Sequence, residues 1–219
     1  MLTDTDLKLM LEAINQTDNI DTYISEESNG GFSNMNNSEV TPTWLFGYGS
    51  LIYKVDFPYL RSEQASITGW QRRFLQGSHD HRGTPEQPGR VVTLVPAAKV
   101  VCKGIAYLVE NNVFDHLDHR EKNGYQRLEV DIALLNEQQK VSGVLYVADE
   151  HNSAYLGAAP TRDIAAHIAG SHGPSGSNRD YVLQLAEALR DLGEMDPHVF
   201  KLESLLRSNN TRQIETSSV

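Results

Sequence analysis

The chain of 219 residues contains one cysteine, Cys102, and no run approaching the roughly 18 consecutive apolar residues of a transmembrane helix. A single cysteine excludes an intrachain disulfide. Basic residues are also scarce, because 19 Lys and Arg against 29 Asp and Glu give a formal net charge of −10. This charge disfavours nucleic acid as a partner, since phosphate binding needs a basic face. The first residues lack the basic and apolar regions of a signal peptide, so we expect a cytoplasmic protein with no membrane association.

Most of the negative charge belongs to the first 43 residues. Residues 1–43 hold eight acids and one base, a net of −7, whereas residues 44–219 have a net of −3. One short helix is predicted by apolar residues at helical spacing, which are Leu7, Met10, Leu11 and Ile14. Residues 15–37 are rich in Asn, Ser, Asp, Glu and Gly and have little to bury. We therefore expect an acidic N-terminal extension over 1–43 that is largely linker or disordered.

Strand patterns dominate the chain from Trp44 onward. Apolar runs predict strands at 44–48, about 66–76, 90–95, 103–109, 126–135 and 140–148. The clearest is 126–135, where apolar and polar residues alternate. Only one helical pattern, 111–121, interrupts the series, so it is not a βαβ succession. The strands are expected to form a mainly antiparallel sheet.

The last third of the domain changes to helical periodicity. One helix is predicted from Pro160 to Gly170, a second after a capping pattern that begins at Ser177, and a third from Pro197 to about Arg207. Helices that follow strands are typical of α+β proteins. The sequence thus predicts a curved, mixed, mainly antiparallel sheet or small β-barrel flanked by helices, in one domain over 44–207 with a polar tail at 208–219.

Glu121 is the first candidate for chemistry. It lies four residues after Leu117 and seven after Phe114, so on a continuous helix its carboxylate extends their apolar face. A carboxylate that faces an apolar interior has a raised pKa, which suits a general base. The alternative is that the helix ends before Glu121, which then faces solvent or caps a turn.

A Gly-x-Gly pattern follows the first predicted strand, at Gly47-Tyr48-Gly49-Ser50. Such glycines can adopt positive φ and present successive N–H groups to an anion. A tight turn without a ligand is the alternative. No third glycine or Gly-Lys-Ser/Thr completes a nucleotide-binding pattern, so no nucleotide cofactor is expected.

A basic stretch at 66–103 carries six Lys and Arg against two acids. Its Arg72, Arg73 and Arg90 are candidates for holding an anionic small molecule. Arg72 and Arg73 can also be adjacent strand residues on opposite faces, at least one of them simply solvated.

Two histidine patterns invite a metal interpretation, His79-Asp80-His81 and the set His116, His119 and Glu121. Neither matches an HExxH or cysteine-containing metal motif, so we favour hydrogen-bonded or solvated histidines and expect no metal. Cys102, between apolar neighbours, is interpreted as a buried strand residue rather than a nucleophile.

Several ordered motifs together resemble the ChaC family of γ-glutamylcyclotransferases, in particular its glutathione-specific branch. The motifs are Phe46–Ile52 (FGYGSLI), Arg72–Phe74 (RRF), Gln76–Ser78 (QGS), Asp80–Gly83 (DHRG), Pro88–Leu94 (PGRVVTL), Arg120–Tyr125 (REKNGY), Tyr155–Gly157 (YLG) and Gly173–Asn178 (GPSGSN). The resemblance covers about 44–207. It departs from the family pattern in the long N-terminal extension and at Asn123, where glycine is usual.

The resemblance implies an enzyme with a γ-glutamylcyclotransferase-like fold and no cofactor. Glu121 matches the family's general acid/base, and residues 47–52 match the loop that binds the γ-glutamyl group: Gly47, Tyr48, Gly49, Ser50, Leu51 and Ile52. Tyr48 and Tyr125 are expected to line the pocket, as hydroxyl donors or as walls, unless they are core residues. The implied reaction cyclises the γ-glutamyl group of reduced glutathione to 5-oxoproline and releases Cys-Gly.

Two other functions are also compatible with these residues. The first is a cyclotransferase for other γ-glutamyl amino acids or amines. The second is a non-catalytic γ-glutamyl-binding module, since fold alone does not fix function. An inward acid beside an intact loop argues against the second, because binding alone does not need it. The sequence does not define an oligomeric state.

Overall fold

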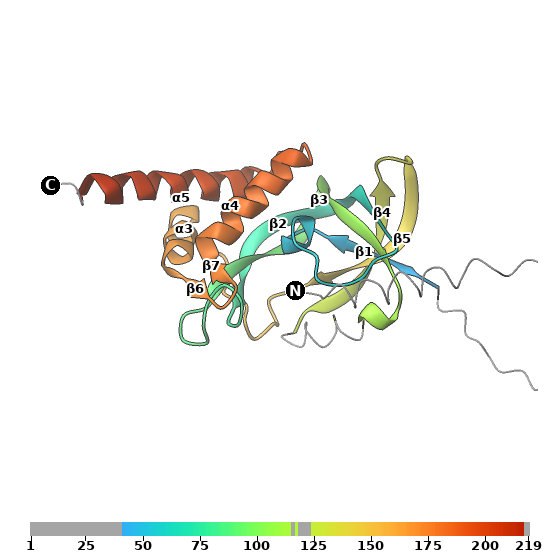
Figure 1. Cartoon of the computed structure of the whole chain (residues 1–219), viewed down its shortest axis with the longest axis horizontal. Helices are drawn as coiled ribbons and strands as arrows, with labels where there is room; N and C mark the ends of the chain where they lie inside the picture. Colours follow the sequence, from blue (N-terminus) through green and yellow to red (C-terminus); the bar gives the residue numbers. More distant parts are fainter. Residues whose placement is uncertain (1–40, 115–116, 118–123, 217–219) are drawn as a thin grey trace, which may run out of the picture. The chain divides into compact units, whose positions relative to one another are not determined.

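A closed barrel of five strands, in the order β1-β3-β2-β4-β5, forms the framework of the unit Glu39–Val219 (Figure 1). The computed structural model describes residues 41–114, 117 and 124–216, with side chains through residue 208. The strands are β1 (Thr43–Gly47), β2 (Arg61–Ser78), β3 (Gly89–Val109), β4 (Gln126–Leu134) and β5 (Gln139–Val147). All pairs are antiparallel except β1 with β5, which closes the barrel in parallel. The prediction of a small, mixed, mainly antiparallel barrel is confirmed.

The two strands predicted at 90–95 and 103–109 are parts of one strand, β3. Its pairing with β2 moves from Thr68↔Val101 to Trp70↔Pro96, which marks a bulge. Lys99, inside this irregular stretch, has φ 66°. Proline and a bulge interrupt the alternation that identifies a strand in a sequence. The prediction of two separate strands was therefore wrong because of this bulge. The long β2–β3 ribbon forms the largest part of the barrel wall.

The helices α3 (Thr161–Gly170), α4 (Asn178–Asp191) and α5 (Pro197–Thr216) gather on one side of the barrel (Figure 1). The Ser177 side chain accepts a hydrogen bond from the Asp180 N–H, which confirms the predicted cap of α4. Apolar residues of α4 and α5 share one core cluster with barrel residues; examples are Leu185, Leu202, Phe74 and Leu94. Helix α5 continues past the predicted end near Arg207, because the polar residues that follow lack an apolar face from which a helix can be recognised.

The predicted helix at 111–121 is described only in part. Residues 112–114 and 117 are helical, and Val113, Phe114 and Leu117 are buried, as their spacing predicted. They pack in a second cluster with Leu45 and Tyr146 of the barrel. Glu121, like the whole of the predicted extension up to residue 40, lies outside the described residues.

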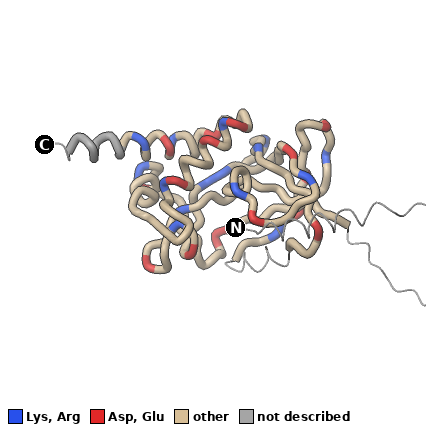
Figure 2. The backbone as a smooth tube through the Cα atoms, viewed as in Figure 1, with Lys and Arg blue, Asp and Glu red and all other residues tan. Residues whose placement is uncertain are grey.

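Two short strands, β6 (His172–Gly173) and β7 (Gly176–Ser177), form a hairpin between α3 and α4. A single 3₁₀ turn, η1 (Ser50–Ile52), follows β1. Acidic and basic residues are interspersed over the barrel and helices (Figure 2). Among the helices of the described part, none has both the length and the apolar character needed to cross a membrane.

Candidate active site

A cavity of about 240 Å³ opens beside the end of β1, a size that suits a small molecule. Its wall combines segments that are far apart in the sequence, because the barrel places β1 between β3 and β5, and residues of β2 and α4 also line the cavity. Among its lining residues are Gly47, Tyr48, Gly49, Ser50, Leu51, Lys54, Ser78, Arg82, Leu117, Tyr125 and Tyr181. Seven residues were predicted to form the γ-glutamyl pocket, namely residues 47–52 and Tyr125. Six of them line this cavity. Ile52 is the seventh, and it packs against the main core cluster instead.

The two glycines of the loop serve close packing rather than positive φ. A Cβ on Gly47 would lie 2.7 Å from Leu51 Cβ, and one on Gly49 would lie 3.1 Å from Val92 Cγ1. Neither glycine has positive φ, so that expectation was wrong. The turn η1 continues the loop, with the Ser50 carbonyl accepting hydrogen bonds from Tyr53 N–H (3.0 Å) and Lys54 N–H (2.8 Å). The loop is thus held compactly against the barrel.

Tyr48 is fixed at both its backbone and its side chain. Its hydroxyl donates to the Tyr146 carbonyl on β5 at 2.7 Å, and its own carbonyl accepts a hydrogen bond from Arg72 Nε at 2.7 Å. Tyr48 is 8% exposed. Tyr48 belongs to the main core cluster and also lines the cavity. Because its hydroxyl is bonded to the Tyr146 carbonyl, the contacts favour a wall over a hydroxyl donor to substrate.

Arg82 and Tyr181 also line the cavity, although the sequence did not assign them to the site. The Arg82 guanidinium donates to the Ser177 carbonyl at 3.3 Å and lies 5.5 Å from the centre of the Tyr181 ring. The Tyr181 hydroxyl accepts a hydrogen bond from Val92 N–H at 3.4 Å. Burial raises the pKa of Tyr181 well above its usual value, so its hydroxyl keeps its proton at neutral pH.

A signal for Arg82 was available in the DHRG motif at 80–83, whereas Tyr181 was hidden. Tyr181 lies on the buried, apolar face of α4, and an aromatic residue at such a position normally indicates core packing. Lys54, a further cavity residue, lies two residues after the end of the 47–52 motif. With Arg82 it gives the cavity two basic side chains, alongside the acidic side chains of Asp56 and Asp80.

The model of the ChaC-like protein family matches residues 43–209. The chain belongs to the ChaC-like family. It is 45% identical over 175 residues to gamma-glutamylcyclotransferase 2-3 of Arabidopsis thaliana, covering 75% of this chain and 88% of that protein. It is 41% identical to glutathione-specific gamma-glutamylcyclotransferase 1 of Danio rerio, covering 74% of this chain and 88% of that protein.

A solved structure agrees with this membership. The crystal structure of the yeast gamma-glutamyl cyclotransferase specific to glutathione superposes on the ChaC-like chain with a TM-score of 0.71 at 31% identity. The match covers 77% of this chain and 96% of the yeast chain. The predicted family and fold are therefore confirmed.

The three arginines predicted as substrate contacts are not among the lining residues of the cavity in the ChaC-like domain. Arg72 is 1% exposed and donates to the carbonyls of Tyr48 and Lys103. Arg73 is part-buried and donates to its neighbours Arg72 and Gln71. That these residues touch substrate stays a prediction, and their observed partners are groups of the protein.

Arg90 ties three segments of the ChaC-like domain together. Its guanidinium donates to the carbonyls of Phe74 (2.9 Å), Gly157 (2.8 Å) and Leu156 (3.3 Å). Burial lowers the pKa of Arg90 from its usual value. The YLG and PGRVVTL motifs thus meet at this side chain, which gives them a structural reason to occur together.

Arg90→Met is expected to lower the free energy of unfolding by about 3 kcal/mol or more, because it leaves buried carbonyls without a donor. Urea denaturation followed by circular dichroism measures this change. A loss below about 1 kcal/mol would show that water or other donors replace the guanidinium.

Glu121 lies outside the described residues of this ChaC-like domain, whereas residues close to it in the sequence line the cavity. Leu117 and Tyr125, four residues before and after it, both line the cavity. The segment that carries Glu121 is therefore attached to the cavity wall at each end. The hydroxyl or wall function of Tyr125 stays a prediction.

Of the two predicted metal patterns, one lies among the described residues and one does not. His79, Asp80 and His81 line the cavity, and His81 Nδ1 lies 3.0 Å from Ser175 Oγ. Within the described part of the ChaC-like chain, no three His, Cys, Asp or Glu residues are grouped to hold a metal ion. The pattern with His116 and His119 lies outside the described residues. Burial raises the pKa of Cys102 to about 11, which leaves little thiolate at neutral pH.

Proposed function

We propose that this chain cyclises the γ-glutamyl group of glutathione and releases 5-oxoproline and Cys-Gly. The observation that carries the proposal is the small cavity in which the FGYGSLI loop meets two cations, within a ChaC-like domain. Relatives that bear the name glutathione-specific gamma-glutamylcyclotransferase include those of Danio rerio and yeast. Glutathione carries two carboxylates and one ammonium at neutral pH, so two cations complement its carboxylates.

The reaction is an intramolecular transfer. The α-amino nitrogen of the substrate attacks the γ-carbonyl carbon, a C–N bond closes the five-membered ring, and the amide bond to cysteine breaks. No water is consumed and no electron changes hands, so the chemistry requires no cofactor. Because nucleophile and electrophile belong to one molecule, the main contribution of the cavity is to hold the cyclising conformation.

Glu121 is proposed as the general acid/base. An ammonium with a pKa of about 8 cannot attack until it has lost a proton. A carboxylate at the cavity can take this proton and then return one to the departing amine of Cys-Gly. The proposal is supported by the cavity contacts of Leu117 and Tyr125 on each side of Glu121 in the sequence.

Arg82 and Lys54 are proposed to bind the carboxylates of glutathione, and the loop at 47–51 to surround the γ-glutamyl group. Arg82 is 9% exposed, and the contacts of its guanidinium with the Ser177 carbonyl and the Tyr181 ring restrict its orientation. A cation that is already oriented loses little conformational entropy on binding.

A panel of substrates tests this assignment. Purified protein should turn over reduced glutathione faster than γ-glutamyl-alanine, and glutathione disulfide at least about tenfold more slowly than reduced glutathione, because a cavity of about 240 Å³ suits one tripeptide. Product formation is followed by chromatography of 5-oxoproline. Faster turnover of γ-glutamyl-alanine would favour the broader cyclotransferase, and equal turnover of the disulfide would contradict the size argument. The name of the Arabidopsis relative, which does not specify glutathione, gives the broader alternative its support.

A further inference from the structure

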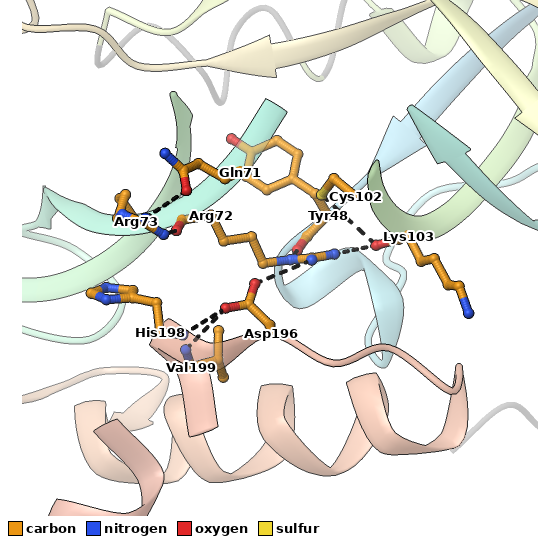
Figure 3. A network of polar contacts seen from close by, with 9 residues as sticks. All are labelled: Tyr48, Gln71, Arg72, Arg73, Cys102, Lys103, Asp196, His198 and Val199. Atoms are coloured by element: carbon orange, nitrogen blue, oxygen red, sulfur yellow. Dashed lines mark hydrogen bonds and ion pairs between the residues drawn. The ribbon is translucent and has the colours of Figure 1, made fainter. Parts of the chain in front are cut away.

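Arg72 occupies a buried position beneath the loop that begins at Gly47 (Figure 3). Its Nε donates to the Tyr48 carbonyl at 2.7 Å, and its Nη2 donates to the Lys103 carbonyl on β3. Its Nη1 lies 3.5 Å from Oδ2 of Asp196, whose side chain is 9% exposed. The planar guanidinium therefore joins the loop, the barrel and the segment before α5.

Asp196 is itself fixed by the helix that follows it. Its Oδ1 accepts hydrogen bonds from the N–H groups of His198 and Val199, each at 3.1 Å. These contacts make Asp196 the N-cap of α5, and its other carboxylate oxygen faces Arg72 (Figure 3). The start of α5 thus determines where the Arg72 guanidinium lies.

The orientation of one peptide group follows from this arrangement. The peptide bonds of the described residues are all trans, so the carbonyl of Tyr48 and the N–H of Gly49 point in opposite directions. With the carbonyl held by Arg72, the Gly49 N–H points away from Arg72. Among the described residues, none accepts a hydrogen bond from this N–H, and Gly49 lines the cavity.

We propose that Asp196 and Arg72 are positioning residues that hold the Tyr48–Gly49 peptide so that the Gly49 N–H stabilises the oxyanion formed on the γ-carbonyl. This inference rests on the proposed function. The permanent carboxylates of the substrate are best matched by the formal charges of Arg82 and Lys54. A neutral N–H is then left for the oxygen whose negative charge develops only in the transition state.

Asp196→Asn is the first test. Asparagine caps a helix about as well as aspartate, so α5 keeps its N-cap while Arg72 loses its anionic partner. We expect kcat for glutathione to fall about 10-fold to 100-fold, because a small displacement of a catalytic donor has effects of this size. KM should stay within about twofold, since the interaction is made in the transition state and not in the ground state.

Arg72→Lys is the second test and reports on the same peptide. Lysine keeps the charge but cannot direct donors to the Tyr48 carbonyl, the Lys103 carbonyl and Asp196 from one plane. We expect a fall in kcat in the same direction. An Arg72 that binds substrate directly, as its sequence suggested, would instead raise KM when replaced.

Glu203→Gln provides a matched control on the same helix. Glu203 is 4% exposed and pairs with Arg190 and with Arg207, whose Nη2 lies 3.0 Å from Oε1. This change also removes a carboxylate from its arginine partners, but none of these three residues lines the cavity. Tm should therefore fall while kcat stays at the wild-type value.

The proposal is overturned if both Asp196→Asn and Arg72→Lys keep the wild-type kcat. It is also overturned if their kcat falls no further than that of Glu203→Gln when the three variants show the same decrease in Tm. A raised KM with unchanged kcat also overturns it. Wild-type protein in the same assay separates the two claims, because wild type without turnover refutes the proposed function and this inference together.

Discussion

Glu121→Gln is expected to reduce turnover of glutathione by about 10² to 10⁴-fold while the protein stays folded. Glutamine has nearly the same shape as glutamate but neither accepts a proton from the ammonium nor donates one to the departing amine. The neighbouring cavity residues Leu117 and Tyr125 are unchanged, so substrate binding should suffer far less than kcat. Steady-state release of 5-oxoproline measures the loss.

Glu129→Gln is the matched control for that prediction. Glu129 lies on the exposed side of β4, and the same substitution there should leave turnover at the wild-type level. A Glu121→Gln protein with near wild-type kcat would contradict the assignment of the acid/base. Another carboxylate at the cavity, Asp56 or Asp80, would then have to be tested for that function.

Gly47→Ala is expected to lower kcat/KM on the order of 100-fold, because a methyl group there displaces the loop that lines the cavity. The new Cβ would lie 2.7 Å from Leu51 Cβ, a distance at which one of the two must move. Leu51 is not free to yield, since its carbonyl accepts a hydrogen bond from the Tyr107 hydroxyl at 2.6 Å. The strain is therefore transmitted to the residues that line the cavity.

Gly170→Ala controls for the loss of a glycine as such. Its added Cβ would meet only Gln87 Nε2, at 3.6 Å, which is an ordinary contact. Activity should be unchanged in that variant, and circular dichroism should show both proteins folded. Full activity in Gly47→Ala would mean that the loop adapts and that its close packing does not position substrate.

The fold could be predicted where local pattern and tertiary burial agree. Alternation identified β4, and the Ser177 cap identified the start of α4, because both signals lie within a few neighbouring residues. The bulge opposite Gly69 could not be predicted, since it depends on the register between β2 and β3. Similarly, the end of α5 has no apolar periodicity that marks it.

The sequence motifs predicted which segments form the candidate site, but not which contacts each side chain makes there. The loop at 47–51 and Tyr125 do line one cavity, although they are more than seventy residues apart in the sequence. The arginines show what charge in the sequence does not determine. The sequence made Arg72 and Arg90 candidates for holding an anion. In the structure their donors reach backbone carbonyls and, for Arg72, also Asp196, whereas Arg82 lines the cavity. Which of several arginines faces a cavity depends on strand register and burial, and neither is visible in composition.

The most direct test of the central claim is the product balance of the purified wild-type protein with reduced glutathione. The account predicts that 5-oxoproline and Cys-Gly appear in equal amounts, without added metal or cofactor, and that free glutamate does not form. Absence of 5-oxoproline, or release of glutamate in its place, would contradict intramolecular cyclisation.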